Sequence, residues 1–521
     1  MESMRRWDKV RRFYILCVYI LLVGPGTALC SASEIEVQPR RAWTVIQYVA
    51  GDNNAARFLG KTLNPLKSSI GSHEAGLNWV LLVDLAKGYG SYSDVFGEDF
   101  VGTRIYELQR DKFIRRGGGD ILPQITTTSA TEANTADAKT LRDFIRFAKK
   151  YYPADHYALI ILSHGTGPYF APDESHGEDV MYTPEVTDVL TGNESVDLMI
   201  LDLCSMASIE NFYQWRPGNG GFSTPLVIAS APSSESPDYG ELVNRITAGK
   251  MKSTARDLVV GGNKVSYRPE ELTPRVFATI VLSDLAESDA DKSWGMFDIG
   301  KAEALKKAFD ELAVTASEDS KARVALEQIR GKGSHLVTMT YLPGAEEHAS
   351  EDLSWLQGYG GDKSWLHCPC LDVYDFASRV AASTSVSDSM RSAGRKIKLL
   401  SEQMTVYSFG SREHWRNFEA GRNGVYFVFP DGELRLEGMR AWDLMKWYSS
   451  DDVRSSLAAD DQAIAAQGQT KPPSNVMKLL KFQRMAYGRL SWAQDGAHPE
   501  GQGVGNWYQL MESWYGRRQN D

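Results

Sequence analysis

The sequence is poor in cysteine and has no long hydrophobic run. Its 521 residues include 5 cysteines, and only Cys204, Cys368 and Cys370 follow residue 33. So few cysteines exclude a disulfide-rich scaffold, and if Cys368 and Cys370 pair, Cys204 is left as a lone thiol. The apolar run near the N-terminus is about a dozen residues long, which is short for a membrane span of about 20. Internal repeats and coiled-coil heptads are also absent.

Basic residues are too few for a nucleic-acid-binding protein. The formal net charge is −10 at pH 7, and loss of residues 1–33 would bring it to −13, because that segment holds five basic and two acidic residues. Binding to nucleic acid needs clustered lysine and arginine that neutralise phosphates. We therefore expect no nucleic-acid partner. Residues 165–203 contain no lysine or arginine at all, but nine acidic residues.

The N-terminus has the layout of a secretory signal peptide. Residues 1–12 are basic, residues 13–24 are apolar, and small residues follow up to Ala32 and Ser33, where cleavage is expected. The pattern predicts a secreted or periplasmic protein with no stable membrane span after cleavage. An uncleaved membrane anchor is the alternative.

Apolar strands alternate with helical segments over the first half of the chain. Continuous apolar strands of this kind predict an α/β protein whose mostly parallel sheet is covered on both faces. Ligand sites in such sheets lie outside the carboxyl ends of the strands. The predicted strands are residues 43–50, 77–85, 157–162, 198–201, 225–230, 277–284 and 423–432, and the predicted helices are residues 136–152, about 205–213 and 301–313.

Two of these strands end in chemically reactive residues. Residues 158–167 (ALIILSHGTG) present His164, and residues 196–210 (VDLMILDLCSMASIE) present Cys204. A cysteine between a strand and a helix N-terminus has a lowered pKa, and a neighbouring histidine can take its proton and later protonate the leaving amine. The backbone N–H groups of Gly165 and Cys204 would form an oxyanion hole. The alternative is a small buried cysteine and a structural histidine.

Three stretches of the sequence resemble the signature blocks of the clostripain family of cysteine peptidases. They are WTVIQYVAGDNN, LSHGTG and ILDLCSMASIE, with weaker matches in VIASAPSSESPDYG, LDVYDFASRV and NGVYFVFP, spanning about residues 43–430. The resemblance implies a caspase-like three-layer fold and a secreted endopeptidase that acts on proteins or peptides, with Cys204 as nucleophile and His164 as general base. The Gln-Ala-Cys signature of caspases themselves is absent.

The same resemblance suggests how the chain is divided. After the signal peptide of residues 1–33, we expect a caspase-like catalytic core over residues 34–250 and a continuation of the peptidase unit over residues 251–434. Residues 435–521 form an extension rich in tryptophan and tyrosine. Packing into the core is the favoured role for these aromatic residues.

The family typically cleaves after arginine or lysine, and an acidic residue two positions before the nucleophile lines the pocket. Asp202 occupies this position, and a buried carboxylate can bind a guanidinium bidentately. Asp238 falls where a second pocket acid is expected, although its surroundings depart from the family pattern. The alternative is that Asp202 caps the following helix or holds the loop. The protein would then be a peptidase of the same fold that cleaves after a non-basic residue. Basic specificity would exclude self-cleavage within residues 165–203.

No metal-ligand set can be assigned from the sequence. The acidic residues 173–179 leave calcium open as a cofactor, but they lack the spacing of an EF-hand, and a solvated loop is the favoured interpretation. Residues 367–370 (HCPC) offer too few ligands for a closed zinc site. Residues 51–54 (GDNN) either border the substrate pocket or form a plain turn.

A catalytically silent binding protein on the same fold is the alternative to an endopeptidase, and it belongs to another functional class.

Overall fold

A computed structural model describes the chain in several ranges. They are residues 35–69, 76–165, 167–177, 179–231, 235–248, 272–288, 293–332, 370–410, 418–429, 435–436, 439–440 and 487–515. The predicted signal peptide, Cys368 and most of the HCPC stretch lie outside them.

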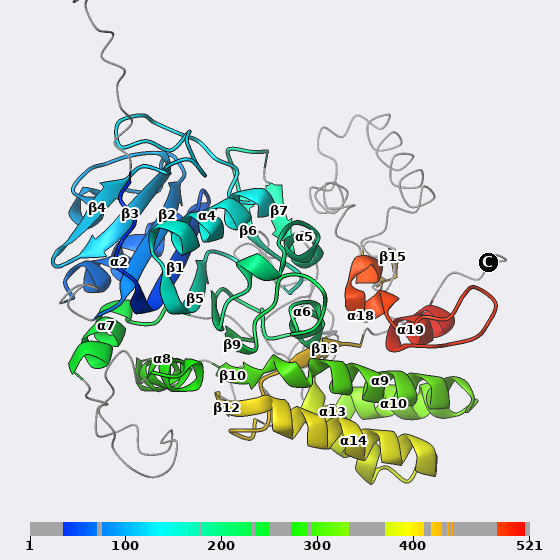
Figure 1. Ribbon diagram of the computed structural model, residues 1–521. Coiled ribbons are helices and arrows are strands. Elements are labelled where there is room, and N and C mark those ends of the chain that lie inside the picture. The colour runs from blue at the N-terminus through cyan, green and yellow to red at the C-terminus, as the bar shows by residue number, and fades with distance from the viewer. Residues whose placement is uncertain are drawn as a thin grey trace, which may run out of the picture.

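One central sheet organises the described part of the chain (Figure 1). Its nine strands are, in order across the sheet, β12 (Thr405–Phe409), β10 (Trp294–Asp298), β9 (Leu226–Ser230), β8 (Leu198–Asp202), β5 (Ala154–Leu162), β1 (Arg41–Gly51), β2 (Asn78–Leu85), β3 (Gly102–Gln109) and β4 (Lys112–Arg116). The five strands from β9 to β2 run parallel to one another. At each edge of the sheet two further strands follow, and each of them pairs antiparallel with the strand before it. The predicted α/β class with a mostly parallel sheet is confirmed.

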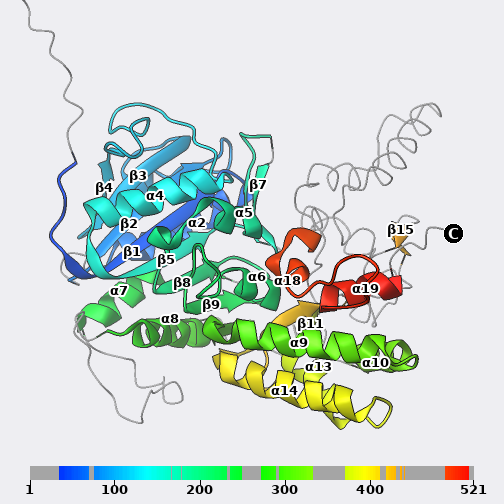
Figure 2. The same cartoon turned by 45° about the vertical axis from the view of Figure 1, so that its right-hand side comes forward.

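Helices cover both faces of this sheet, so that the molecule has three layers (Figures 1 and 2). Side chains of β1 alternate between two hydrophobic clusters: Ile46 and Tyr48 belong to one, Val45 and Val49 to the other. The first cluster includes α4 (Ala138–Tyr151), α5 (Thr183–Val189) and α6 (Ile209–Gln214). The second includes α2 (Leu59–Lys67), α3 (Ser93–Phe96), α7 (Tyr239–Ala248) and α8 (Pro274–Ser288). Burial on both faces explains why the parallel strands are almost entirely apolar.

The C-terminal half adds helices to the first cluster. They are α9 (Ala302–Ser317), α10 (Ala322–Lys332), α13 (Val373–Ala382), α14 (Asp388–Met404), α18 (Ser491–Gln494) and α19 (Trp507–Tyr515), with a small antiparallel pair formed by β11 (Cys370–Asp372) and β13 (Tyr426–Val428). Trp492 and Trp507 are completely buried there, as expected for aromatic residues of the extension. Cys370 is also buried.

Short elements complete the description. They are η1 (Asn54–Phe58), the hairpin of β6 (Tyr169–Asp173) and β7 (Asp179–Tyr182), η2 (Gly192–Glu194), η4 (Ile299–Lys301), the pair β14 (Arg435–Leu436) and β15 (Met439–Arg440), and η7 (Tyr487–Arg489).

One predicted strand, residues 277–284, is wrong. These residues lie inside the helix α8. Because α8 is buried on nearly all sides, polar Thr279 and Ser283 lie in the same environment as apolar Phe277 and Val281. The two hydroxyl groups donate to carbonyl oxygens four residues earlier, which satisfies them within the helix. A helix that is apolar on all sides has no 3.6-residue periodicity in its sequence, and it resembles a buried strand.

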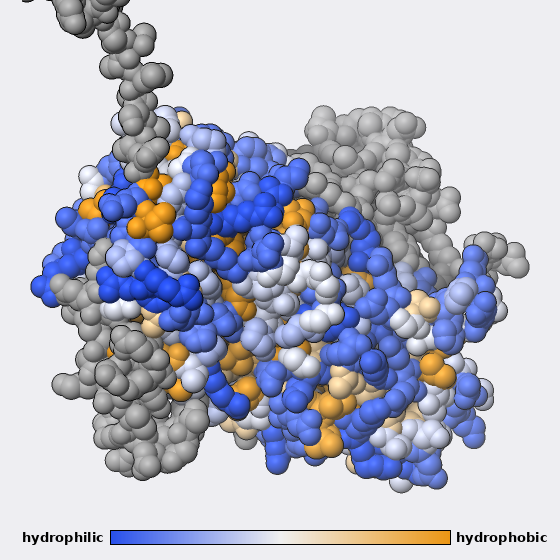
Figure 3. Space-filling model, viewed as in Figure 1, coloured by the Kyte–Doolittle hydropathy of each residue, from blue (hydrophilic) through white to orange (hydrophobic). Residues whose placement is uncertain are grey.

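The surface in Figure 3 is mostly hydrophilic over the described residues, with apolar side chains in small separate groups. Among the described residues, the large hydrophobic side chains that are exposed are Val37, Phe58, Val101, Val324 and Leu399. In the same part of the chain, we find no helix that combines the length and the apolar character needed to cross a membrane.

Candidate active site

The carboxyl ends of β5 and β8 bring the two predicted reactive residues to one edge of the sheet. Leu162 lies opposite Asp202 in this parallel pair. His164 and Cys204 each follow two residues later, and the Ser163 N–H donates to the Asp202 carbonyl oxygen at 3.4 Å. Because neighbouring strands are about 4.8 Å apart, the two residues stand at the start of adjacent loops.

Gly165 lies where these two loops touch. A Cβ atom at this position would lie 2.9 Å from the Cys204 carbonyl oxygen and 3.1 Å from Leu203 Cβ. Two residues later, the Gly167 N–H donates to the Ser205 carbonyl oxygen at 3.0 Å. Glycine is therefore required at position 165 by the close approach of the loops. Its contact with Cys204 places the two residues of the expected oxyanion hole side by side.

Cys204 is partly exposed and is followed by a tight turn rather than directly by a helix. Ser205 has a positive φ of 57°, and its carbonyl oxygen accepts a hydrogen bond from the Tyr426 hydroxyl at 2.5 Å. The helix α6 begins only at Ile209, after its N-cap Ser208. The predicted helix start at about residue 205 is therefore wrong. The positive end of α6 is separated from Cys204 by a turn, which weakens the sequence-based argument that this helix lowers the thiol pKa.

The His164 ring is half-buried and contacts Asn54. Its Nε2 atom forms a hydrogen bond with Asn54 Oδ1. With this oxygen as acceptor, the neutral ring carries its proton on Nε2, and Nδ1 keeps a lone pair. Burial lowers the pKa of His164, which favours the neutral imidazole that can accept a proton.

The sequence analysis left residues 51–54 as a turn or a pocket border, and the structure gives them a more specific position. Asn53 caps η1 by accepting from the Ala55 N–H at 2.9 Å. Its Nδ2 donates to the Pro172 carbonyl oxygen at 2.8 Å and to the Ala50 carbonyl oxygen at 3.0 Å. These bonds fix the backbone beside Asn54. The contact of Asn54 with the histidine could not be found from sequence spacing, because 110 residues separate the two.

Asp202 lies at the end of β8, buried beneath α7. The Tyr239 hydroxyl donates to Asp202 Oδ2 at 2.6 Å. Burial raises the pKa of Asp202 to about 6, although hydrogen bonds from Tyr239 and Ser236 oppose this shift. Asp202 lies two residues from Cys204, and its ionised form is unfavourable there because the side chain is buried. A cation beside the carboxylate would stabilise that form.

Asp238 precedes Tyr239 at the start of α7. Its side chain is exposed, and Oδ1 accepts a hydrogen bond from the Glu241 N–H at 2.9 Å, as a helix cap does. The structure thus brings the segment of Asp238 next to Asp202 through Tyr239. The observed role of the Asp238 carboxylate is to cap the helix.

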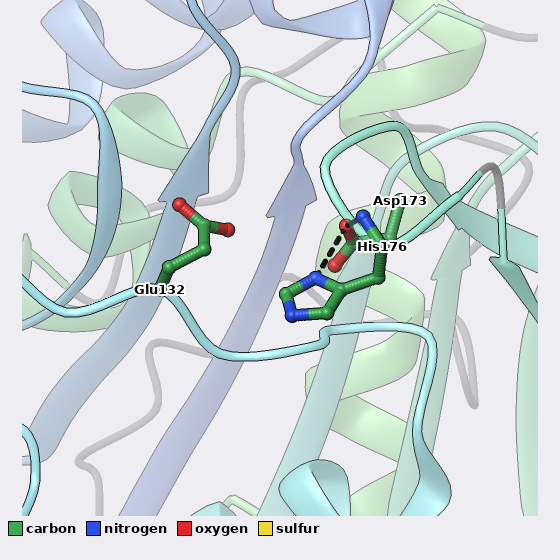
Figure 4. Close-up of side chains that lie close together, drawn as sticks. All are labelled: Glu132, Asp173 and His176. Carbon is green, nitrogen blue, oxygen red and sulfur yellow. Dashed lines mark hydrogen bonds and ion pairs between the residues drawn. The ribbon is translucent and has the colours of Figure 1, made fainter.

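The structure also assembles an acidic cluster that the sequence analysis found only in part. Oxygen atoms of Asp52, Asp84, Glu132 and Asp173 all lie within 4.8 Å of one another. Asp52, Asp84 and Asp173 are completely buried, and Glu132 is exposed. Figure 4 shows Glu132 and the Asp173–His176 pair on separate segments, with His176 Nδ1 bonded to Asp173 Oδ1 at 2.9 Å. Of the acidic residues 173–179, Asp173 therefore belongs to the cluster.

The electrostatics of this acidic cluster are unfavourable for carboxylates alone. Although the Glu132 side chain is exposed overall, partial burial of its carboxyl group, followed by the charges of Asp52 and Asp173, raises its pKa to about 7. Burial and the charges of Glu132 and Asp173 raise the pKa of Asp84 well above its usual value. Oxygen donors in such a group match the ligands that calcium prefers.

The fold and this site together define a class of protein. A parallel α/β sheet carries a thiol and an imidazole at the carboxyl ends of two adjacent central strands, as in a cysteine peptidase. Comparison with known proteins then gives the family. The chain belongs to the clostripain family of cysteine peptidases, because the family model described as "Clostripain family" matches residues 47–460.

Similar proteins include clostripain of Hathewaya histolytica, which is 31% identical over 500 residues, 91% of this chain and 86% of that protein. A solved structure of a secreted C11 cysteine protease from Bacteroides thetaiotaomicron, in complex with an irreversible peptide inhibitor, is 17% identical. The match covers 76% of this chain and 95% of that chain, with a TM-score of 0.46. An inactive zymogen C11 protease from Parabacteroides distasonis is 16% identical over 75% of this chain and 94% of that chain, with a TM-score of 0.45. The chain is thus a cysteine endopeptidase whose substrates are proteins or peptides.

Proposed function

We propose that the chain is a secreted endopeptidase that hydrolyses peptide bonds after arginine or lysine by means of a Cys204–His164 dyad. The main observation that supports the Cys204–His164 dyad is the register of β5 and β8. Their paired ends, Leu162 and Asp202, start the two adjacent loops. The signal-peptide layout of residues 1–33 supports secretion.

In this mechanism the Cys204 sulfur attacks the carbonyl carbon of the scissile bond. His164 Nδ1, which keeps its lone pair when Nε2 is bonded to Asn54, takes the thiol proton and transfers it to the leaving amine. The carbonyl oxygen becomes an oxyanion, for which the N–H groups of Gly165 and Cys204 are the proposed donors. Water then attacks the resulting thioester, and His164 again acts as the base.

The proposed preference for a basic residue before the cut rests on Asp202. This carboxylate is buried two residues from the nucleophile, and its pKa is about 6. A guanidinium or ammonium group would stabilise its ionised form, and the Tyr239 hydroxyl would remain as a further donor. Asp238 is assigned to the same pocket on the weaker ground that its segment lies beside Tyr239.

One observation favours a second specificity. Tyr239 already donates a short hydrogen bond to Asp202, which is the contact expected if this carboxylate only supports the loop. The alternative is therefore a peptidase of the same fold that cleaves after a non-basic residue. The lack of lysine and arginine in residues 165–203 fits either specificity, since a basic preference simply excludes self-cleavage there.

The test uses the protein from residue 34 onward and a peptide library varied at the residue before the cut. Cleavage after arginine or lysine that is lost in Cys204→Ala and in His164→Ala supports the proposal. Asp202→Asn should lower kcat/KM for an arginine substrate about 100-fold, because it removes one partner of a buried charge pair. A citrulline substrate, which is neutral and of similar shape, should change about threefold or less.

Asp155→Asn is the matched control, since this exposed aspartate lies at the opposite end of β5 and pairs with Arg40. Cleavage only after other residues would keep the dyad and reject the pocket. No cleavage, with no alkylation of Cys204 by iodoacetamide, would favour a silent binding protein on this fold.

A further inference from the structure

We propose that Asn211 is a positioning residue of the peptidase, because its buried amide ties the loop of His164 to the loop of Cys204. The amide thereby sets the distance between the two reactive side chains. This inference rests on the proposed Cys204–His164 dyad. Asn211 lies on the short helix α6, which follows the loop of Cys204, and its side chain is completely buried. No step of the proposed mechanism uses this side chain.

The amide nitrogen of Asn211 donates to one main-chain carbonyl oxygen on each loop. Nδ2 lies 2.7 Å from the Gly167 carbonyl oxygen, in the histidine loop (residues 163–168). It lies 3.3 Å from the Met206 carbonyl oxygen, in the cysteine loop (residues 203–208). A primary amide has two N–H donors, so this one group can satisfy both carbonyl oxygens at once.

The amide oxygen of Asn211 fixes the orientation of the group. Oδ1 lies 3.0 Å from the hydroxyl of Thr183, at the start of α5, which packs beside α6 (Figure 1). The same hydroxyl is 2.7 Å from the Pro168 carbonyl oxygen, but that oxygen already accepts the Thr183 N–H at 2.7 Å. The hydroxyl proton is thus available to Asn211. With a donor at Oδ1 and two acceptors at Nδ2, only one orientation of the amide satisfies every contact.

Gly167 is bonded toward the cysteine side through both of its main-chain polar groups. Its N–H donates to the Ser205 carbonyl oxygen at 3.0 Å, and its carbonyl oxygen accepts from Asn211. Its φ of 79° lies in the left-handed region, which glycine adopts without strain. The histidine loop therefore cannot move away from the cysteine loop without breaking both hydrogen bonds.

The position requires an amide and not merely a polar side chain. Aspartate has the same shape but no N–H group, so its oxygen would face two carbonyl oxygens and repel them. A buried carbonyl group without a donor is unfavourable, and the two loops could relieve this only by moving apart. Asparagine is also a weak helix former, so helix propensity does not explain its presence in α6.

Separation of the two loops would affect the chemistry directly. The proposed proton transfer needs His164 Nδ1 close to the Cys204 sulfur, and the expected oxyanion hole needs Gly165 beside Cys204. A displacement of 1 Å at an active site can reduce the rate about 100-fold. Asp202 belongs to the strand β8, before the cysteine loop, so the binding of the substrate side chain should change less than the chemical step.

Asn211→Asp is the diagnostic variant, and Asn506→Asp is the matched control. Asn506 is also completely buried. Its Nδ2 donates to the carbonyl oxygens of Ala493 and Asp495 at 2.8 and 3.0 Å, and its Oδ1 accepts from the Gln509 N–H at 2.9 Å. These partners all belong to the C-terminal extension. The two substitutions therefore remove the same kind of hydrogen bonds, but Asn211 alone of the two links the reactive loops.

The experiment uses the protein from residue 34 onward and the peptide that the wild type cleaves best. We expect a lowered urea midpoint in both variants. The value of kcat should fall about 10- to 100-fold in Asn211→Asp, with KM within about threefold, and should stay within about twofold of the wild type in Asn506→Asp. A second readout is the pH dependence of Cys204 alkylation by iodoacetamide. Its midpoint should move toward about 8.5, the pKa of a free thiol, in Asn211→Asp alone of the two variants.

Three results would overturn the proposal. The first is a wild-type kcat and alkylation profile in Asn211→Asp. The second is a raised KM with unchanged kcat, which would assign Asn211 to substrate binding. The third is an equal loss of kcat in Asn506→Asp, which would make general destabilisation the cause. If Asn211→Asp shows no cooperative unfolding, Asn211→Ser, which leaves space and no charge, replaces it with the same expected results.

His164→Ala separates this proposal from the proposed function. If its alkylation profile equals that of the wild type, the dyad is wrong, and the role of Asn211 fails with it. If the profile shifts in His164→Ala but not in Asn211→Asp, the dyad is supported and the role of Asn211 alone is wrong. A shift in both variants, with none in Asn506→Asp, supports both proposals.

Discussion

Gly165→Ala tests how closely the histidine and cysteine loops are packed. The added Cβ atom would lie 2.8 Å from the Met206 sulfur, 2.9 Å from the Cys204 carbonyl oxygen and 3.1 Å from Leu203 Cβ. Ordinary contacts between carbon atoms lie at about 3.5–4.0 Å. The Met206 side chain can turn away, but the Cys204 carbonyl is backbone. The methyl group must therefore move the loops apart by about half an ångström.

This displacement should reduce activity more than stability. Overpacking by one methyl group destabilises a protein by about 1–3 kcal/mol, and a shift of 1 Å at an active site can reduce the rate about 100-fold. We expect kcat on an arginine substrate to fall about 10- to 100-fold with a modest change in KM. Stability is measured by urea unfolding, and the fraction of reactive thiol by alkylation of Cys204.

The control is Gly60→Ala, in the helix α2. Apart from its chain neighbours and the backbone of its own helix, no atom of the described residues lies within 4 Å of a Cβ atom built at Gly60. Alanine is favoured over glycine in a helix by up to about 1 kcal/mol, so this variant should be fully active and slightly more stable. Wild-type kcat and stability in Gly165→Ala would refute the close packing on which the dyad geometry depends.

Three further predictions concern the surroundings of the site. Asn54→Ala should lower kcat about 10-fold with little change in KM, because His164 loses the acceptor that orients its ring. Asn54→Asp should instead shift the acid limb of the pH–rate profile, because a carboxylate at Nε2 stabilises the imidazolium. Tyr426→Phe removes the hydrogen bond to the Ser205 carbonyl oxygen and should destabilise the protein by about 1 kcal/mol in urea unfolding. Glu210 is completely buried, and burial raises its pKa from 4.5 to about 7. Between pH 4.5 and 7 the group ionises in the unfolded chain but stays protonated in the folded protein. The free energy of unfolding should therefore fall by up to about 3 kcal/mol over this range, and Glu210→Gln should remove most of this contribution.

Each of these predictions has a contradicting result. A pH–rate profile of Asn54→Asp identical to that of the wild type would show that residue 54 does not contact the histidine during catalysis. Equal urea midpoints for Tyr426→Phe and the wild type would mean that water replaces the tyrosine donor. A Tm that changes with pH between 4.5 and 7 as strongly in Glu210→Gln as in the wild type would assign that dependence to other groups.

The sheet and the position of the site were predictable because their physical signals are local. Residues 157–162 and 198–201 are apolar runs, and they form β5 and β8 as expected. Parallel strands end at the same edge, so His164 and Cys204 could be assigned to one edge before their partners were known. The predicted helix start after Cys204 was wrong because Ser205 adopts a positive φ. Serine rarely does so, and nothing in the surrounding sequence predicts it.

The remaining contacts depend on chain segments that lie far apart in sequence. Asn54 meets His164 only because β1 and β5 are neighbours in the sheet, and the acidic cluster needs β1, β2, β6 and the segment of Glu132 together. Residues 173–179 carried a partial signal, since Asp173 is the one residue of that stretch in the set of four carboxylates. Asp84 looked like part of an ordinary strand, and no spacing rule connects it to Asp173.

The turn after Cys204 is held by residues from the far end of the chain. The Tyr426 hydroxyl donates to the Ser205 carbonyl oxygen at 2.5 Å, and its N–H donates to the Ala207 carbonyl oxygen at 3.0 Å. Glu210 Oε1 in turn accepts from the Val428 N–H and from the Tyr487 hydroxyl, both at 2.9 Å. The positive φ at Ser205 is unfavourable on its own and persists because the surrounding structure fixes it. Since Tyr487 belongs to the C-terminal extension, the conformation of the cysteine loop depends on chain that follows it by more than 200 residues.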